Sequence, residues 1–262
     1  MTGQNISTMP EPDFCENIRE LLEVRALATP DRPFLFSEAD GREYSYKEFD
    51  RAVNRTARLL LSHGIKKGDV VSLLLPNSAE YLIAYFACFK LGALAGPVNS
   101  LLKPQEMAYV IAHSEARALL VQTQFLPQIE EVRVELPALD VVIEFDDERR
   151  ATREFAHEFH SDDALATTAI TKDDVAFIIY TSGTTGKPKG CLLTHGNLLA
   201  NARQITSWLN FTERDRLLIV MPLFHVNAVM VTTLAPLYAH GSTVVTPKFS
   251  VKRFWQIVSD IP

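Results

Sequence analysis

The chain has 262 residues, of which 47% are hydrophobic, and a formal net charge of −6 from 26 Lys and Arg against 32 Asp and Glu. This size allows a substantial buried core in one large domain or two small ones, whereas the mild acidity lacks the electrostatic footprint of a nucleic-acid-binding protein. The three cysteines have neither metal-ligand nor CxxC spacing, so no metal site is indicated and a reducing cytoplasm is the simplest compartment.

The first stretch of the chain, residues 1–12, is polar and lacks the charged start and apolar core of a signal peptide. The most apolar stretch, residues 81–91, contains Lys90 and is shorter than the ~18 residues expected of a membrane helix. We therefore expect a buried helix there and no transmembrane segment.

Between residues 70 and 143, short apolar runs alternate with helical patterns. Pro76 and Asn77 end the first apolar run as a turn does, and Asn77 or Ser78 can cap the helix that follows. Pro104 stands where the first turn of a second helix would begin. The patterns predict strands at 70–75, 94–98, 118–121 and 141–143, and helices at 79–91 and 105–113.

Residues 144–163 are charged and carry little apolar signal, which favours a solvated connection over an acidic functional site. Beyond them the alternation resumes, with Thr194 as a helix cap and Pro236 expected to limit a later helix. The patterns predict strands at 175–180, 191–193, 217–220 and 244–245, and helices at 197–208, 226–238 and 251–257. Such alternation predicts an α/β fold with mainly parallel sheets flanked by helices, arranged as two sheet layers from the parts before and after the charged connection.

The loop at residues 181–190 reads TSGTTGKPKG. Its glycines let the backbone approach an anion and direct successive N–H groups at it. Its hydroxyls add donors without bulk, and its lysines add compact positive charge. Ordinary surface loops use the same residue types, so composition alone leaves a phosphate site and a plain loop about equally supported.

The loop is not the P-loop of kinases and GTPases. That motif requires GxxxxGK followed by Ser or Thr. Here Gly183 and Gly186 are too close together, and Pro188 follows Lys187. A nucleotide site of that class is therefore disfavoured.

The string YTSGTTGKPKG, from Tyr180 to Gly190, resembles without departure the phosphate-loop signature of the adenylate-forming superfamily of acyl-CoA synthetases, aryl-CoA ligases, luciferases and peptide-synthetase adenylation domains. Weaker similarities in the family's order, at residues 44–49, 61–70, 77–97 and 194–198, extend the resemblance over most of residues 20–260. The resemblance implies that the loop embraces the β- and γ-phosphates of ATP. It assigns phosphate contacts to Thr181, Ser182, Gly183, Thr184, Thr185 and Lys189. Lys187 stands at a position that the family varies and receives no role.

Two further positions resemble family sites. Residues 222–225, PLFH, are similar to a motif that ends a strand beside the acyl pocket. A histidine after an apolar run is by default a packed residue, but the resemblance implies that His225 contacts the acyl substrate and the nucleotide. Phe224 followed by His225, rather than by Asp, favours a substrate without an α-amino group. Lys248 resembles a basic position that contacts CoA in some ligases, although a surface lysine of no function is at least as well supported.

The resemblance implies ATP-dependent activation of a carboxylic acid, a fatty or related acid, to acyl-AMP and then acyl-CoA. ATP, CoA and the acid would be the small-molecule partners, and Mg²⁺ the cofactor. Residues 1–19 are expected to form an extension and residues 20–262 an adenylation domain incomplete at its C-terminus. The catalytic lysine is expected beyond Pro262, which leaves this chain inactive alone. Two alternatives stay open: a non-catalytic nucleotide-binding fragment, and an adenylating enzyme that loads a carrier protein.

Overall fold

The computed structural model describes residues 15–145, 165, 168–181 and 187–261. The strands are β1 (Pro33–Ser37), β2 (Arg42–Ser45), β3 (Val70–Leu74), β4 (Leu94–Pro97), β5 (Ala118–Gln122), β6 (Val141–Phe145), β7 (Val175–Thr181), β8 (Lys189–Thr194), β9 (Arg216–Ile219) and β10 (Ser242–Val245). The helices are α1 (Ile18–Ala28), α2 (Tyr46–Ser62), α3 (Ala79–Leu91), α4 (Pro104–His113), α5 (Leu126–Glu131), α7 (His195–Leu209), α8 (Val226–Val229), α9 (Ala235–Tyr238) and α10 (Val251–Asp260), with short turns η2 (Thr123–Phe125) and η3 (Arg133–Glu135) and a π-helical segment η4 (Met230–Leu234).

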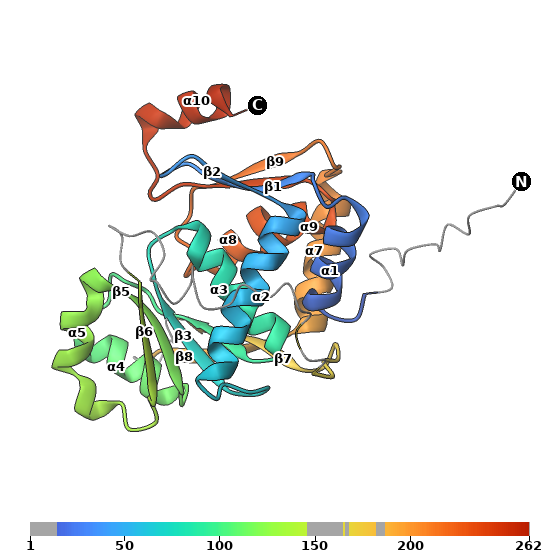
Figure 1. Cartoon of the computed structure of the whole chain (residues 1–262). Helices are drawn as coiled ribbons and strands as arrows, with labels where there is room; N and C mark the ends of the chain where they lie inside the picture. Colours follow the sequence, from blue (N-terminus) through green and yellow to red (C-terminus); the bar gives the residue numbers. More distant parts are fainter. Residues whose placement is uncertain (1–14, 146–164, 166–167, 182–186, 262) are drawn as a thin grey trace, which may run out of the picture.

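These elements form two sheets, with the strand orders β6-β5-β3-β4-β7-β8 and β2-β1-β10-β9. Among the described residues the strands pair in parallel, except that β2 is antiparallel to β1 and β8 to β7. A layer of helices that includes α2 and α3 lies between the two sheets, and α4 and α5 cover the other side of the six-stranded sheet (Figure 1). The predicted α/β architecture with mainly parallel sheets flanked by helices is confirmed.

Helix α3 is buried on every side because it lies in that central layer, where it contacts β1 of one sheet and β3 of the other. Its residues are all buried except Glu80. A helix that is apolar all around belongs inside a protein, and the prediction of a buried helix is confirmed. Ser78 caps it by accepting a hydrogen bond from Tyr81 N, and Gly92, in the left-handed conformation at φ 69°, ends it.

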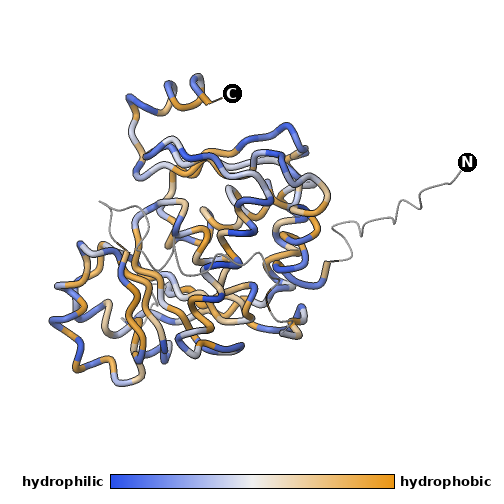
Figure 2. The backbone as a smooth tube through the Cα atoms, viewed as in Figure 1, coloured by the Kyte–Doolittle hydropathy of each residue, from blue (hydrophilic) through white to orange (hydrophobic). Residues whose placement is uncertain are grey.

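The six-stranded sheet separates two apolar clusters, because successive side chains of a strand point to opposite faces. On β3, Val71 and Leu73 belong to the cluster shared with the central helices, whereas Val70 and Leu74 belong to the cluster under α4 and α5. Hydropathy colouring of the backbone shows apolar segments along these strands (Figure 2).

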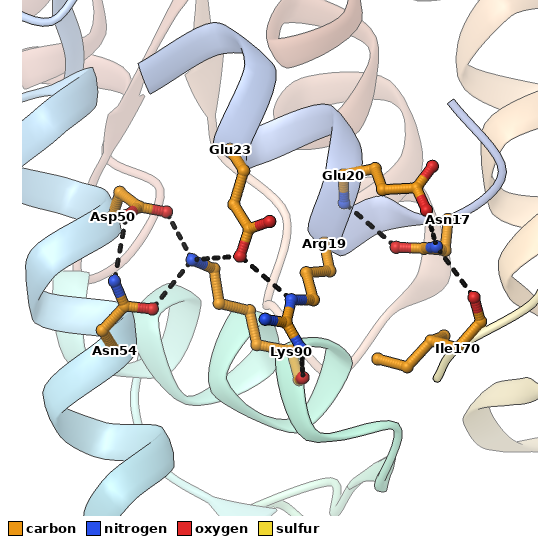
Figure 3. Close-up of polar contacts among 8 residues, drawn as sticks. All are labelled: Asn17, Arg19, Glu20, Glu23, Asp50, Asn54, Lys90 and Ile170. Atoms are coloured by element: carbon orange, nitrogen blue, oxygen red, sulfur yellow. Dashed lines mark hydrogen bonds and ion pairs between the residues drawn. The ribbon is translucent and has the colours of Figure 1, made fainter. Parts of the chain in front are cut away.

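A buried ammonium group joins the first three helices (Figure 3). The Lys90 side chain is 1% exposed, and its Nζ lies 2.6 Å from Asp50 Oδ1 and 3.2 Å from Glu23 Oε1. Asn54 Oδ1 accepts a third contact from it at 2.8 Å, and Arg19 Nε pairs with the same Glu23 oxygen at 3.0 Å. The charges are thus paired and hydrogen-bonded, as buried charges must be.

One expectation about the architecture is wrong. The sheets do not divide at the charged connection: β1 pairs with β10 and β4 with β7, so each sheet takes strands from both sides of it. The helical stretch predicted at 226–238 is confirmed, because α8, η4 and α9 follow one another from Val226 to Tyr238 and end two residues after Pro236. Proline cannot donate to the carbonyl one turn back, and the π-helical segment immediately before it adjusts the turn. The carbonyl oxygen of Thr232, one turn before Pro236, instead accepts a hydrogen bond from the Thr243 hydroxyl at 2.6 Å.

No helix in the described part of the chain is long and apolar enough to span a bilayer.

Candidate functional site

The loop identified from the sequence connects the two strands of the β7–β8 hairpin. Thr181 and Lys189 face each other as the outermost described pair, followed by Tyr180 and Gly190. Both Thr181 and Lys189 are exposed. Four of the predicted phosphate-binding residues, Ser182, Gly183, Thr184 and Thr185, lie outside the described residues. The structure therefore places only the two ends of the predicted site, and places them opposite each other.

Helix α4 packs against both sides of this hairpin. The Tyr109 hydroxyl donates to Pro188 O at 3.2 Å, and Lys187 Nζ lies 5.5 Å from the centroid of the Tyr109 ring. One helical turn further on, His113 Nδ1 lies 2.8 Å from the Tyr180 hydroxyl. Burial raises the pKa of Tyr180 to about 12, so its phenol stays protonated at neutral pH.

A side chain at Gly190 would be crowded by its neighbours. A Cβ at this position would lie 3.0 Å from Ile178 Cδ1 and 3.3 Å from Tyr180 Cζ. The Tyr180 ring packs across its directly opposed partner on β8, which must therefore be glycine or force those side chains to move. The last glycine of the loop motif thus has a packing role, in addition to any role in approaching an anion.

The hairpin lies at the carboxyl edge of the parallel strands. Because β7 runs parallel to β4, and β4 to β3, the loop leaves β7 at the same edge where the chain leaves β3 and β4. In open α/β sheets, ligands bind in the crevice outside the carboxyl ends of such strands. The position of the hairpin is therefore that of a ligand-binding loop.

Asn77, just after β3, connects this edge to the segment that carries His225. Its side chain donates to Met221 O at 3.0 Å and accepts from Leu223 N at 2.7 Å. The buried Tyr85 of α3 donates to Leu223 O at 2.7 Å. The segment after β9 is thus bound through its backbone to the loop after β3.

His225 precedes the short helix α8 and is exposed. Its ring lies 4.5 Å from the Phe224 ring between centroids, and its backbone N donates to Pro222 O at 2.9 Å. The side chain makes no capping hydrogen bond to α8. His225 is therefore not the packed core histidine that its apolar context favours by default, and its imidazole remains accessible.

Lys248 follows β10 and is also exposed. Because β10 and β9 are parallel, the segments that carry Lys248 and His225 begin at the same edge of the four-stranded sheet. The Thr246 hydroxyl, just after β10, donates to the carbonyl oxygen of Ile219 at the end of β9 at 2.9 Å. This bond connects the ends of the two strands. The hairpin, His225 and Lys248 thus all follow the carboxyl ends of parallel strands, and Asn77 joins the edges of the two sheets.

The sequence pattern indicates only a helix cap at Asn77 and predicts no role for Tyr85 or Tyr109. For Asn77 the sequence does contain a signal. Because Ser78 caps α3, Asn77 is a second polar side chain after a buried strand that has no partner in the cap. No comparable signal marks Tyr85 or Tyr109, because their hydroxyl partners lie 138 and 79 residues away in the chain.

Among the described residues, no group of three or more His, Cys, Asp or Glu side chains could hold a metal ion.

The fold, together with the residues at the carboxyl ends of its parallel strands, defines an α/β protein. Its glycine- and hydroxyl-rich loop lies at a ligand-binding position. The chain belongs to the family of AMP-binding enzymes, whose sequence signature matches residues 22–261.

Individual relatives agree with this assignment. The chain is 34% identical over 262 residues to a crotonobetaine/carnitine–CoA ligase of Salmonella paratyphi B, covering 93% of this chain and 49% of that protein. It is 32% identical over 253 residues to a sulfoacetate–CoA ligase of Cupriavidus necator, covering 94% and 48%. The crystal structure of the N-terminal domain of FACL13 from Mycobacterium tuberculosis superimposes with a TM-score of 0.81 at 28% identity, covering 94% of this chain and 61% of that one. The chain thus spans about half the length of the curated relatives it matches.

Proposed function

We propose that the protein carrying this chain activates a carboxylic acid with ATP and transfers the acyl group to CoA. In the first step a carboxylate oxygen attacks the α-phosphorus of ATP, and the bond to the bridging oxygen breaks, which yields acyl-AMP and pyrophosphate. In the second step the thiol of CoA attacks the acyl carbon, AMP leaves, and the thiol proton is released. The observation that carries the proposal is the β7–β8 hairpin, which presents Thr181 opposite Lys189 in a member of the AMP-binding family.

Charge is the main obstacle in the first step, because an anion attacks an anion. A lysine ammonium and hydroxyl donors at the end of a rigid hairpin would hold the β- and γ-phosphates and stabilise the charge that develops on pyrophosphate. Thr181 and Lys189 take this role in our proposal, together with residues 182–185. Magnesium, when bound to the triphosphate, would neutralise part of its charge.

The acid would bind near His225, and CoA near Lys248. The exposed imidazole of His225 can donate a hydrogen bond to the acid or the nucleotide. It need not act as a base, because a carboxylate is already a nucleophile at neutral pH. We propose a fatty or related acid without an α-amino group. The named relatives act on crotonobetaine or carnitine and on sulfoacetate, so members this similar accept acids of different character.

The test is carboxylate-dependent exchange of labelled pyrophosphate into ATP, measured on the protein expressed from its whole reading frame with a panel of acids. Lys189→Ala should lower exchange about a hundredfold, the usual loss when one transition-state donor is removed. Lys172→Ala is the matched control, because it removes an equally exposed lysine outside the predicted loop. Normal exchange in Lys189→Ala, or its loss in both variants, would contradict the assignment.

Two further measurements separate the alternatives. Residues 1–262 alone should show thermal stabilisation by ATP but no exchange, on the expectation from the family resemblance that another part of the protein supplies the lysine for adenylation. Robust turnover by these residues would show that this expectation is wrong. A carrier protein that accepts the acyl group while CoA does not would replace the second step, and the absence of exchange with every acid would favour a non-catalytic nucleotide-binding role.

A further inference from the structure

We propose that Tyr109 of α4 is a positioning residue for ATP, which sets the geometry of the β7–β8 hairpin while touching no substrate. This inference rests on the proposed function, since it concerns how the same hairpin holds phosphate. It also gives a role to Lys187, the lysine of the loop motif to which the sequence assigned none.

Tyr109 contacts the C-terminal arm of the hairpin in two ways. Its hydroxyl donates to Pro188 O at 3.2 Å, and its ring lies beneath Lys187 Nζ at 5.5 Å from the centroid. The first contact fixes the backbone immediately before Lys189. The second is a cation–π contact, which directs the Lys187 ammonium to the helix. Among the described residues Lys189 makes no such contact, so it is the lysine that we expect to meet an anion.

The N-terminal arm is held by the same helix. His113, four residues after Tyr109 and therefore on the same face of α4, bonds the Tyr180 hydroxyl at 2.8 Å. The two rings meet edge to face with centroids 5.7 Å apart, and Tyr180 is the residue before Thr181. The backbone on both sides of residues 182–186 is thus attached to one rigid helix.

Attachment at both arms has a consequence for binding. A triphosphate site needs its donors held in place before the ligand arrives, because ordering them on binding costs free energy that would otherwise appear as affinity. Helix α4 is itself anchored, since Met107 and Ile111 belong to the apolar cluster under the six-stranded sheet. The contacts of Tyr109 therefore attach Pro188, and with it the neighbouring Lys189, to a helix that is held in place by the core.

The experiment compares Tyr109 and Lys187 variants of the protein expressed from its whole reading frame. Tyr109→Phe removes a single oxygen and keeps the ring, and it should raise the KM for ATP about fivefold, the factor that corresponds to one hydrogen bond. Tyr109→Leu removes both contacts and should raise this KM about twentyfold. The KM for the acid should not change in either variant. Gln105→Ala is the matched control, because Gln105 lies one turn earlier on the same face and bonds Glu131 rather than the hairpin.

A double-mutant cycle separates positioning from general stability. Lys187→Met alone should raise the KM for ATP by a few-fold, yet add nothing in the Tyr109→Leu background, because the partner ring is already absent. If Lys189→Ala lowers exchange about a hundredfold while Tyr109→Phe, Tyr109→Leu and Lys187→Met all keep the wild-type KM for ATP, the positioning role is overturned and the proposed function stands. If the wild-type protein shows no exchange at all, the proposed function fails instead. Should Tyr109→Leu not fold, Tyr109→Phe and Lys187→Met decide the question.

Discussion

The Asn77→Ala variant tests whether the two sheet edges are joined as the structure indicates. Asn77 is 8% exposed and bonds two backbone groups of the segment after β9, at 2.7 Å to Leu223 N and 3.0 Å to Met221 O. Alanine removes both bonds and leaves the buried N–H of Leu223 without its acceptor. Asn77→Asp is the informative companion, because it keeps the acceptor but places a second carboxylate oxygen against the carbonyl of Met221.

The loss in the free energy of unfolding can be worked out from the hydrogen bonds that Asn77→Ala removes. Each lost hydrogen bond removes about 1 kcal/mol of stability, and an unsatisfied buried donor adds a further cost of about 1–3 kcal/mol. We therefore expect Asn77→Ala to lower the free energy of unfolding by about 3–5 kcal/mol. At an m-value of ~3 kcal/mol/M this moves the urea midpoint down by about 1–1.7 M. Asn77→Asp should be no more stable than the alanine variant.

Urea unfolding is best followed by far-UV circular dichroism, because both tryptophans, Trp208 and Trp255, are exposed in the folded chain and report little on burial. Asn227→Ala is the control, since Asn227 is an exposed asparagine close to the same segment. If Asn77→Ala unfolds at the wild-type midpoint, or if Asn227→Ala falls by as much, the reasoning from the two hydrogen bonds is refuted.

Replacing Lys90 by Met leaves the Asp50 carboxylate without its buried ammonium partner and should cost about 3 kcal/mol in urea unfolding; an added Asp50→Leu should recover part of the loss, and a purely additive result would contradict the coupling. Gly241→Ala would place a Cβ 2.5 Å from the backbone oxygen of Asp215 and should destabilise by about 3 kcal/mol, whereas a wild-type melting temperature would show that the turn has space. Burial lowers the pKa of His195 to about 4 from 6.5, so the unfolded chain takes up a proton that the folded chain resists, and stability should fall as pH drops from 6.5 to 4. His195→Asn should flatten urea midpoints measured across that pH range, and an unchanged slope would exclude the histidine as a source.

Local structure could be predicted where periodicity and turn chemistry act together. The helix predicted at 79–91 is α3, with the bounds Ala79–Leu91 and the Ser78 cap, because a long apolar run between a polar cap and a glycine allows few alternatives. Residues 15–62 yielded no prediction of an element, although α2 has a capping box formed by Ser45 and Glu48. The sequence contains that signal, because Ser45 stands three residues before Glu48.

Part of the candidate site could also be predicted. The loop motif, His225 and Lys248 all lie after the carboxyl ends of parallel strands, and their assigned roles stay predictions. The residues that hold this region together were not predicted. Asn77 meets Leu223 across 146 positions of the chain, and such a partner cannot be read from local spacing.

The sequence by itself determined the elements, the alternation that makes the fold α/β, and the chemical character of the loop, since these depend on neighbouring residues and on turn geometry. The tertiary structure alone decided which strands share a sheet. β1 pairs with β10, about 200 residues later, because burying both faces of α3 requires a sheet on each side of it. The same packing placed α4 against the hairpin and Asn77 between the two edges. Contacts of this kind depend on which apolar faces can be covered at once, a property of the whole chain rather than of any segment.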